Sequence, residues 1–281
     1  KECDWSSDVC SSDLGSGSDT WKYWAELRAG NISEQDWQDV EDGIARSPGH
    51  CMTMGTASTM TSAAEVLGLT LPGAASIPAP DSRHAQMATL SVKHIVDLVW
   101  NDIKPLDYLT PASFDNAVTT VLALGGSTNS IVHLIAMSRR AGFDLNLDRF
   151  DELARRTPVL ANLRPSGQYL MEDFYYAGGL RGLLTRITDL LDTKQRNALG
   201  QTLEESLQGA QVYNDDVIRT RDLPLVHRDG LAVLRGNLAP DGAVIKPAAM
   251  EPHLRQHTGR AVVFKDYNDM SARIDDPNLP V

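Results

Sequence analysis

The feature that most constrains the fold is a helical repeat of apolar side chains between residues 114 and 122. These residues recur at i, i+3, i+4, i+7 and i+8, the spacing of one buried helix face; they are Phe114, Ala117, Val118, Val121 and Leu122. Gly125-Gly126 interrupts the repeat, and a second apolar series starts after residue 129 and ends near Gly142. The sequence therefore predicts a consecutive pair of helices.

Three further helices are predicted nearer the N-terminus. One covers 21–29, and a second runs from a Ser33 cap to about residue 44, with acidic residues in its first turn. A third spans about 56–67 and stops at Gly68. The Pro-rich, small-residue stretch 72–80 that follows is better suited to lining a site than to filling a core.

Beyond about residue 220 the pattern changes to short β-type runs separated by turn residues. The runs cover 231–234, 243–245 and 261–264. We therefore expect a helix-rich α/β domain over 15–220 and a β-rich region over 221–281. Residues 1–14 contain Ser-Ser-Asp twice without helical or strand periodicity, and we interpret them as an artefact or a disordered tail, so that Cys3 and Cys10 are discounted as ligands.

Composition excludes several classes of function. The chain has 281 residues, 42% of them hydrophobic and 22% charged, which is ordinary for a folded globular protein. A net charge of −11 argues against nucleic acid or an anionic membrane surface as partner. The sequence shows neither an apolar run long enough for a membrane span nor a secretory signal. Three cysteines are too few for a disulfide framework, so a reducing cytoplasmic location is expected.

Cys51 is the first candidate functional residue. It follows a Pro48-Gly49 turn and precedes small, helix-compatible residues, so the pattern predicts a thiol just before a helix. The unpaired N–H groups of a helix start favour a thiolate, which is a ligand for soft metals and clusters. A packed, inert cysteine is the alternative. Among the scattered histidines, only His50 lies beside this candidate.

The second candidate is the run from Gly125 to Asn129. Glycines permit close approach of the backbone to a ligand, and the polar groups of Ser127, Thr128 and Asn129 at a helix start can bind carboxylate or phosphate oxygens. The alternative is an ordinary helix cap after a glycine turn.

The third candidate is the segment 164–179, which is dense in polar turn residues, tyrosines and carboxylates. This composition fits a binding loop followed by a helix. Glu172 and Asp173 are either binding groups or acidic residues that interact with the dipole of a helix N-terminus.

Together these motifs resemble the dihydroxy-acid and sugar-acid dehydratase family. The resemblance extends from about residue 17 to 281. The amino-acid sequence around Cys51 and at 21–24 is most similar to the arabinonate/xylonate branch. The matching segments are 48–60, 67–73, 124–130, 165–179 and 236–243. The fold that this implies is a helix-rich α/β N-terminal domain followed by the first part of a β-rich, barrel-like C-terminal domain.

The resemblance implies a specific chemistry. Family members remove water from a 2,3-dihydroxy acid to give a 2-keto-3-deoxy acid. A [2Fe–2S] cluster held by three cysteines activates the leaving hydroxyl, Mg²⁺ holds the substrate, and a serine takes the C2 proton. Cys51 matches the last cluster cysteine, and Ser127, Thr128 and Asn129 are candidates for substrate binding. The implied substrate is a small sugar acid or dihydroxy acid, and the full-length protein is expected to be a homo-oligomer.

The chain departs from the family pattern in what it omits. The first two cluster cysteines and acidic Mg²⁺ ligands are expected upstream, and the serine base and the last Mg²⁺ carboxylate beyond Val281. We therefore expect the chain to be the middle of a dehydratase and to be inactive alone. The alternatives are a dihydroxy-acid dehydratase of branched-chain amino-acid synthesis, and a short non-catalytic binding or subunit module of the same lineage.

Overall fold

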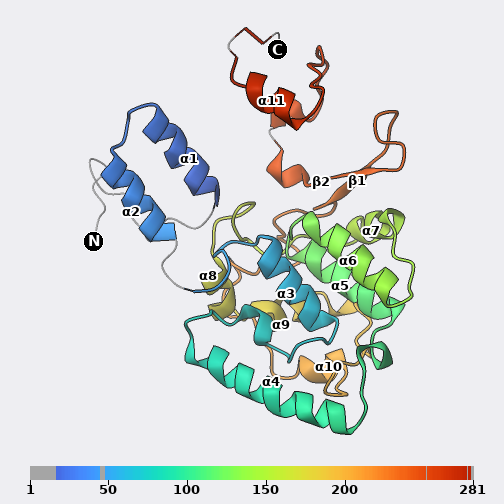
Figure 1. The fold of residues 1–281 in the computed structure, drawn as a ribbon. Helices are drawn as coiled ribbons and strands as arrows, with labels where there is room; N and C mark the ends of the chain where they lie inside the picture. The colour runs from blue at the N-terminus through green and yellow to red at the C-terminus, as the bar shows by residue number, and fades with distance from the viewer. Residues whose placement is uncertain (1–16, 45–47, 251, 277, 280–281) are drawn as a thin grey trace. The chain divides into compact units, whose positions relative to one another are not determined.

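The computed structural model describes residues 17–44, 48–250, 252–276 and 278–279. The chain divides into two compact units, one up to Ala248 and the other from Ala249 onward (Figure 1). This division differs from the domain boundary that the sequence predicts near residue 220. That domain boundary stays a prediction. The interpretation of residues 1–14 falls outside the described residues.

The first two helices form a hairpin that is stabilised locally. Helix α1 spans Gly17–Arg28 and α2 spans Glu34–Ile44, with the Trp24 and Trp37 rings edge-to-face at 5.4 Å between centroids. The predicted cap is confirmed, because the Ser33 hydroxyl accepts from the Asp36 N–H at 3.1 Å and the Asp36 carboxylate accepts from the Ser33 N–H at 2.7 Å. These two bonds satisfy N–H groups that a helix start otherwise leaves unpaired.

The predicted helix pair forms the centre of the first unit. Helix α5 spans Pro111–Ala123, with Thr110 as its capping residue, and ten of its residues are buried. Helix α6 (Asn129–Arg140) follows, and α3 (Thr56–Val66) and α7 (Leu147–Ala154) pack against the pair. Their apolar side chains form one continuous core cluster that includes Phe114, Leu134 and Phe150.

A second apolar cluster lies under shorter helices. Helices α8 (Met171–Tyr176), α9 (Gly179–Thr185) and α10 (Leu203–Ser206) contribute to it, with Phe174 and Leu183 fully buried. The 3₁₀ turn η1 (Ala74–Ser76) packs against α8 and α9, and η3 (Thr188–Leu190) lies between α9 and α10. The side chains of Met54 and Val66 join this cluster, so the segment around α3 belongs to both cores.

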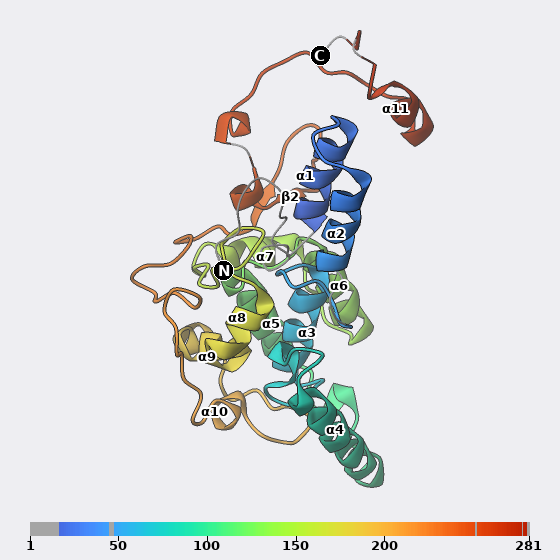
Figure 2. The same ribbon diagram turned by 90° about the vertical axis from the view of Figure 1, so that its left-hand side faces the viewer.

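Helix α4 is the longest helix of the described chain and was not predicted. It spans Ser82–Trp100 and has no buried residue, and η2 (Pro105–Asp107) follows it. Figures 1 and 2 show α4 at the edge of the first unit rather than among the core helices.

Two of the three expected β-type runs are strands. Strands β1 (Ala232–Leu234) and β2 (Ala243–Ile245) pair antiparallel, with Val233 opposite Val244. The run 261–264 is irregular, so that part of the prediction is wrong. The second unit holds η5 (Pro252–Leu254) and α11 (Tyr267–Arg273), and η4 (Pro247–Ala249) precedes them. A barrel-like C-terminal domain stays a prediction.

Candidate functional site

A pocket of about 290 Å³ opens beside Cys51. One wall is the segment from Pro48 to Met52, and the opposite wall is the stretch 74–80, the small-residue loop that the sequence suggests as the lining of a site. His84 at the start of α4 and Glu172 in α8 complete the rim. The side chain of Cys51 is exposed, so its thiol is accessible rather than packed in a core.

Backbone hydrogen bonds, rather than a helix start, hold the Cys51 segment. Four residues separate Cys51 from Thr56, where α3 begins, which confirms the predicted helix at about 56–67 and the expectation of a thiol just before it. The Met171 N–H donates to the Met52 carbonyl at 2.7 Å, and the Met54 N–H donates to the Arg164 carbonyl at 2.9 Å. These two bonds attach the strip carrying Cys51 to the 164–179 segment.

The 164–179 segment therefore contributes directly to the Cys51 pocket, but its two carboxylates differ in role. Glu172 is exposed and lines the pocket. Asp173 accepts a hydrogen bond from the Leu170 N–H at 2.9 Å and so stabilises the start of α8. The helix-start interpretation is therefore confirmed for Asp173, and a binding role for Glu172 stays a prediction.

The glycine-rich run packs on the start of α3. The Ser127 and Thr56 hydroxyls lie 3.1 Å apart, and the Asn129 side-chain amide donates to Thr56 Oγ1 at 2.8 Å. A Cβ on Gly126 would lie 2.7 Å from Thr59 Cγ2, so only glycine allows this close approach. All three candidate segments thus meet around α3.

Ser127, Thr128 and Asn129 do not line the Cys51 pocket among its described lining residues. Thr128 is the N-cap residue of α6 without a side-chain capping bond, and Ser127 Oγ accepts from the Asn129 N–H at 3.2 Å. The structure accounts for Ser127 and Asn129 through packing and helix initiation. Their role in substrate binding stays a prediction.

Lys246 reaches the same glycine turn from the end of β2, and the sequence analysis did not identify it. Its ammonium donates to the Gly125 carbonyl at 2.5 Å, and burial lowers its pKa. The β1–β2 hairpin is thereby attached to the glycine turn that precedes α6. The available signal was a single lysine directly after the apolar strand 243–245.

Glu65 is a second unpredicted residue, and it holds the pocket wall from behind. Its side chain is 8% exposed, and its carboxylate accepts from the Gly73 N–H at 2.6 Å and the Ala75 N–H at 2.8 Å. Burial raises its pKa to about 6. The sequence signal is a lone carboxylate within the otherwise apolar 63–67.

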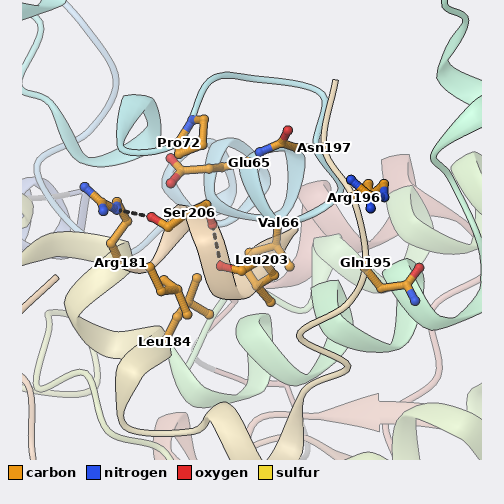
Figure 3. Close-up of a pocket in the computed structure, with 11 residues that line it drawn as sticks. Glu65, Val66, Pro72, Arg181, Leu184, Gln195, Arg196, Asn197, Leu203 and Ser206 are labelled. Carbon is orange, nitrogen blue, oxygen red and sulfur yellow. Dashed lines mark hydrogen bonds between the residues drawn. The ribbon is translucent and has the colours of Figure 1, made fainter. Parts of the chain in front are cut away.

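A small cavity of about 20 Å³ adjoins Glu65, enough for about one water molecule. Figure 3 shows Glu65 next to Pro72 at this cavity, with Arg181 donating to the Ser206 carbonyl at 2.8 Å. On the other side of the loop, the Ser76 hydroxyl accepts from the Leu180 N–H at 2.9 Å. The first part of the wall facing Cys51, residues 73–76, is thus fixed by hydrogen bonds to Glu65 and Leu180.

The described residues do not by themselves fit a complete metal centre. Within them, no group of three or more His, Cys, Asp or Glu side chains is placed to hold an ion. Cys51 is the one cysteine that this part of the chain includes, whereas an iron–sulfur cluster needs several protein ligands. No step of chemistry is therefore derived through a cluster or through Mg²⁺. None of the described helices is long and apolar enough to cross a membrane.

Comparison with known proteins gives the family. The N-terminal domain model of the dihydroxy-acid/6-phosphogluconate dehydratases matches residues 7–206, and the C-terminal domain model matches 216–279. The chain therefore belongs to the dihydroxy-acid/6-phosphogluconate dehydratase family, which confirms the resemblance seen in the sequence.

Several curated relatives align over nearly the whole chain. A 6-deoxy-6-sulfo-D-gluconate dehydratase of Pseudomonas putida is 50% identical and an L-arabinonate dehydratase of Rhizobium leguminosarum 46% identical, each over 95% of this chain and 47% of its own length. A dihydroxy-acid dehydratase of Caldicellulosiruptor bescii is 44% identical over 84% of this chain and 43% of its own. The chain spans about half the length of these relatives.

Proposed function

We propose that the protein carrying this chain is a hydro-lyase that removes water from a 2,3-dihydroxy sugar acid and forms a 2-keto-3-deoxy acid. The C2 proton and the C3 hydroxyl leave together as water, so the reaction needs no oxidant or reductant. The observation that carries the proposal is the convergence of the three family-type segments around α3, with an exposed Cys51 in an adjoining pocket.

The preference for a sugar acid rests on coverage. The sulfogluconate and arabinonate dehydratases align over 95% of this chain, whereas the dihydroxy-acid dehydratase aligns over 84%. Dihydroxy-acid dehydration in branched-chain amino-acid synthesis is the second candidate, because that relative is also 44% identical.

For Cys51 we propose the role of one ligand of a [2Fe–2S] cluster, with the remaining donors outside the described residues. The exposed thiol on a fixed backbone strip supports this role, since ligand positions must be held in place. When bound, such a cluster supplies a positive centre for the departing hydroxide. Mg²⁺ is proposed as the second cofactor, also with ligands outside the described part.

The chain's own residues are proposed to shape the pocket and to bind the substrate. The fixed wall at 74–77 closes one side of the pocket, and Glu172 supplies polarity at its rim. Ser127, Thr128 and Asn129 are proposed to bind oxygens of the acid, as the hydroxyl and amide groups at the start of α6 allow.

The test is an anaerobic assay of the polypeptide that carries this chain in its natural reading frame. Arabinonate, xylonate, 6-deoxy-6-sulfogluconate and 2,3-dihydroxyisovalerate are offered separately, and the keto product is trapped with semicarbazide. We expect turnover of at least one sugar acid. Turnover of dihydroxyisovalerate alone supports the second candidate, and no turnover by an iron-loaded protein contradicts both.

The role of Cys51 has its own readout. Cys51→Ser should lower the iron-to-protein ratio and the visible absorbance of the reconstituted protein, because a hydroxyl is a weaker ligand for iron than a thiolate. Thr61→Ser is the matched control, since Thr61 lines the same pocket without a thiol, and it should keep full iron content. Equal iron content in the two variants would contradict the ligand assignment.

A further inference from the structure

The carboxylate of Glu65 lies behind the wall of the Cys51 pocket and divides its two oxygens between two groups of that wall. Oε1 accepts from the Gly73 N–H at 2.6 Å, and Oε2 accepts from the Ala75 N–H at 2.8 Å. Glu65 is near the end of α3 and is 8% exposed, so both bonds are shielded from water. The position of the turn at 73–75 therefore depends on this one side chain.

The turn that Glu65 holds is also the surface that the pocket presents to Cys51. Ala74, Ala75 and Ser76 all line the pocket. Gly73 has a φ of +89°, in the left-handed region that favours glycine, and this conformation starts the η1 turn. A shift of the turn away from α3 would change the shape of the pocket directly.

The charge of Glu65 is stabilised by these N–H groups rather than by an ion pair within the described residues. Arg181 on α9 acts on the carboxylate from a distance, and its guanidinium donates to two backbone carbonyls at the end of α10. Arg196 borders the small cavity beside Glu65 and donates to the Gly200 carbonyl (Figure 3). Both cations are thus engaged elsewhere.

The other elements around α3 and the cavity direct their titratable groups away from Glu65. Helices α5 and α6 and the turn η1 pack against α3, and η1 has no ionisable side chain. Asp115, the one charged residue of α5, forms an ion pair with Arg149 at 2.6 Å. The titratable residues of α6 and of α10 are exposed; they are His133, Arg139, Arg140, Glu204 and Glu205.

A proton on Glu65 competes with one of the two wall bonds. The ionised carboxylate offers a strong acceptor to each N–H group, whereas the neutral form has one oxygen that carries the proton and accepts weakly. Burial favours the neutral form and the two N–H groups favour the ion, which together give a pKa of about 6. The bond pattern therefore changes in a pH range close to neutrality.

We propose that Glu65 is a proton-controlled positioning residue, whose ionised form holds the wall at 73–76 in the shape that binds the substrate and whose neutral form releases it. The inference rests on the proposed function for the identity of the ligand, a sugar acid. Affinity for that acid is highest above about pH 6 and is lost as the pH falls through this value, because the proton removes a wall bond.

The first test measures amide hydrogen exchange of the chain and needs no activity. Protection factors at Gly73 and Ala75, corrected for the intrinsic effect of pH, should fall roughly 10-fold or more between pH 7.5 and pH 5. Glu65→Gln has one amide oxygen and one NH₂ group, so it can accept from only one of the two N–H groups. Its protection at 73–75 should be low at both pH values.

Ser62→Ala is the matched control for exchange. Ser62 is buried in the same helix, and its hydroxyl donates to the Ser58 carbonyl within α3 rather than to the wall. The variant should keep the protection of the parent at 73–75 and its dependence on pH. Amides of α5 report global unfolding in all three proteins, so a local release of the wall is distinguished from a general loss of stability.

The second test uses the polypeptide that carries this chain in its natural reading frame, with a sugar acid that it turns over. At pH 7.5 Glu65→Gln should raise KM about 10-fold and change kcat less, because the wall contributes to binding rather than to chemistry. The parent's KM should approach that of Glu65→Gln as the pH falls to 5.5, while Ser62→Ala follows the parent.

The two readouts separate failure of this inference from failure of the proposed function. Equal protection at 73–75 in the parent and Glu65→Gln, or protection in the parent that does not change with pH, would overturn the proton-controlled wall. The expected exchange together with an unchanged KM would overturn its role in binding the acid. Absence of turnover contradicts the proposed function, and the exchange result then decides the control of the wall by itself.

Discussion

Helices α4 and α5 are both rich in apolar residues, but only α5 has buried residues. Ten residues of α5 are buried, and its neighbours α3, α6 and α7 account for them. In α4 no residue is buried, although the helix is longer. Apolar content alone therefore does not decide burial; the number of partner elements around a helix does.

The difference also separates two sources of helix stability. Helix α5 gains free energy from its core contacts, as most helices in proteins do. Helix α4 has no buried residue and depends on its own backbone bonds, its Asp81 cap and one narrow contact face around His94. We therefore expect substitutions in the two helices to differ in how much they lower the free energy of unfolding.

The largest effect is expected for Phe114→Ala in α5. Phe114 is 1% exposed, so its truncation leaves a cavity and should lower the free energy of unfolding by about 3–5 kcal/mol. Trp100→Ala in α4 is the comparison, because Trp100 is 82% exposed, and it should cost less than about 0.5 kcal/mol in dilute monomer. Urea denaturation measures both, and equal losses would refute the contrast between the helices.

A smaller loss is expected where the glycine turn meets α3. In Gly126→Ala the new Cβ would lie 2.7 Å from Thr59 Cγ2 and 3.0 Å from Val121 Cγ1, so packed atoms must shift, at a cost of about 1–3 kcal/mol. Gly236→Ala is the control, because no atom lies within 4 Å of its added Cβ. Similar urea midpoints for both variants would show that Thr59 and Val121 can shift at little cost in stability.

The elements that sequence patterns predicted well are those with one clear apolar face or a strong cap. The spacing from Phe114 to Leu122 fits only a helix with one buried face. The start of α2 follows from Ser33 and Asp36. Helix α4 was missed because its apolar residues lie on both faces, so no single buried stripe stands out. The run 261–264 has β propensity, but propensity does not supply a pairing strand.

At the candidate site, sequence reasoning found the segments but not the contacts that fix them. Cys51, the 74–80 loop and Glu172 do share one pocket. The contribution of Glu65 depends on two backbone N–H groups brought back to α3 by a loop, and that of Lys246 on a hairpin returning to Gly125. These pairings join residues that local spacing does not relate.

The buried carboxyl of Glu65 in α3, which packs against α5, makes the free energy of unfolding depend on pH. Its pKa of about 6 lies above the ordinary 4.5, so the folded chain binds this proton more tightly than the unfolded chain. The resulting stabilisation is fully present below pH 4.5 and is lost as the pH rises through about 6. From the size of the shift, the loss is about 2 kcal/mol.

Glu65→Gln removes this titration and leaves all others, so the parent is its own matched control. The free energy of unfolding of the parent minus that of the variant should therefore decrease by about 2 kcal/mol between acidic and neutral pH. Urea denaturation across the pH series gives both curves. Two parallel curves would show that burial does not act on this carboxyl as described.

The smallest effect is expected at the cap of α4, where the exposed helix can be compared with a packed one. The Asp81 carboxylate accepts from the Arg83 N–H at 2.8 Å, and the Asn146 side chain accepts from the Arg149 N–H at 3.1 Å at the start of α7. Asp81→Ala should destabilise α4 locally by about 1 kcal/mol, seen as faster amide hydrogen exchange along the helix in dilute protein.

In Asn146→Ala the first turn of α7 should loosen, but amides near Phe150 should keep their protection, because opening there requires Phe150 to leave the core. Protection of α4 as high as that of α5 would mean that the exposed helix is as stable as the buried one, and the contrast between the two helices would then fail.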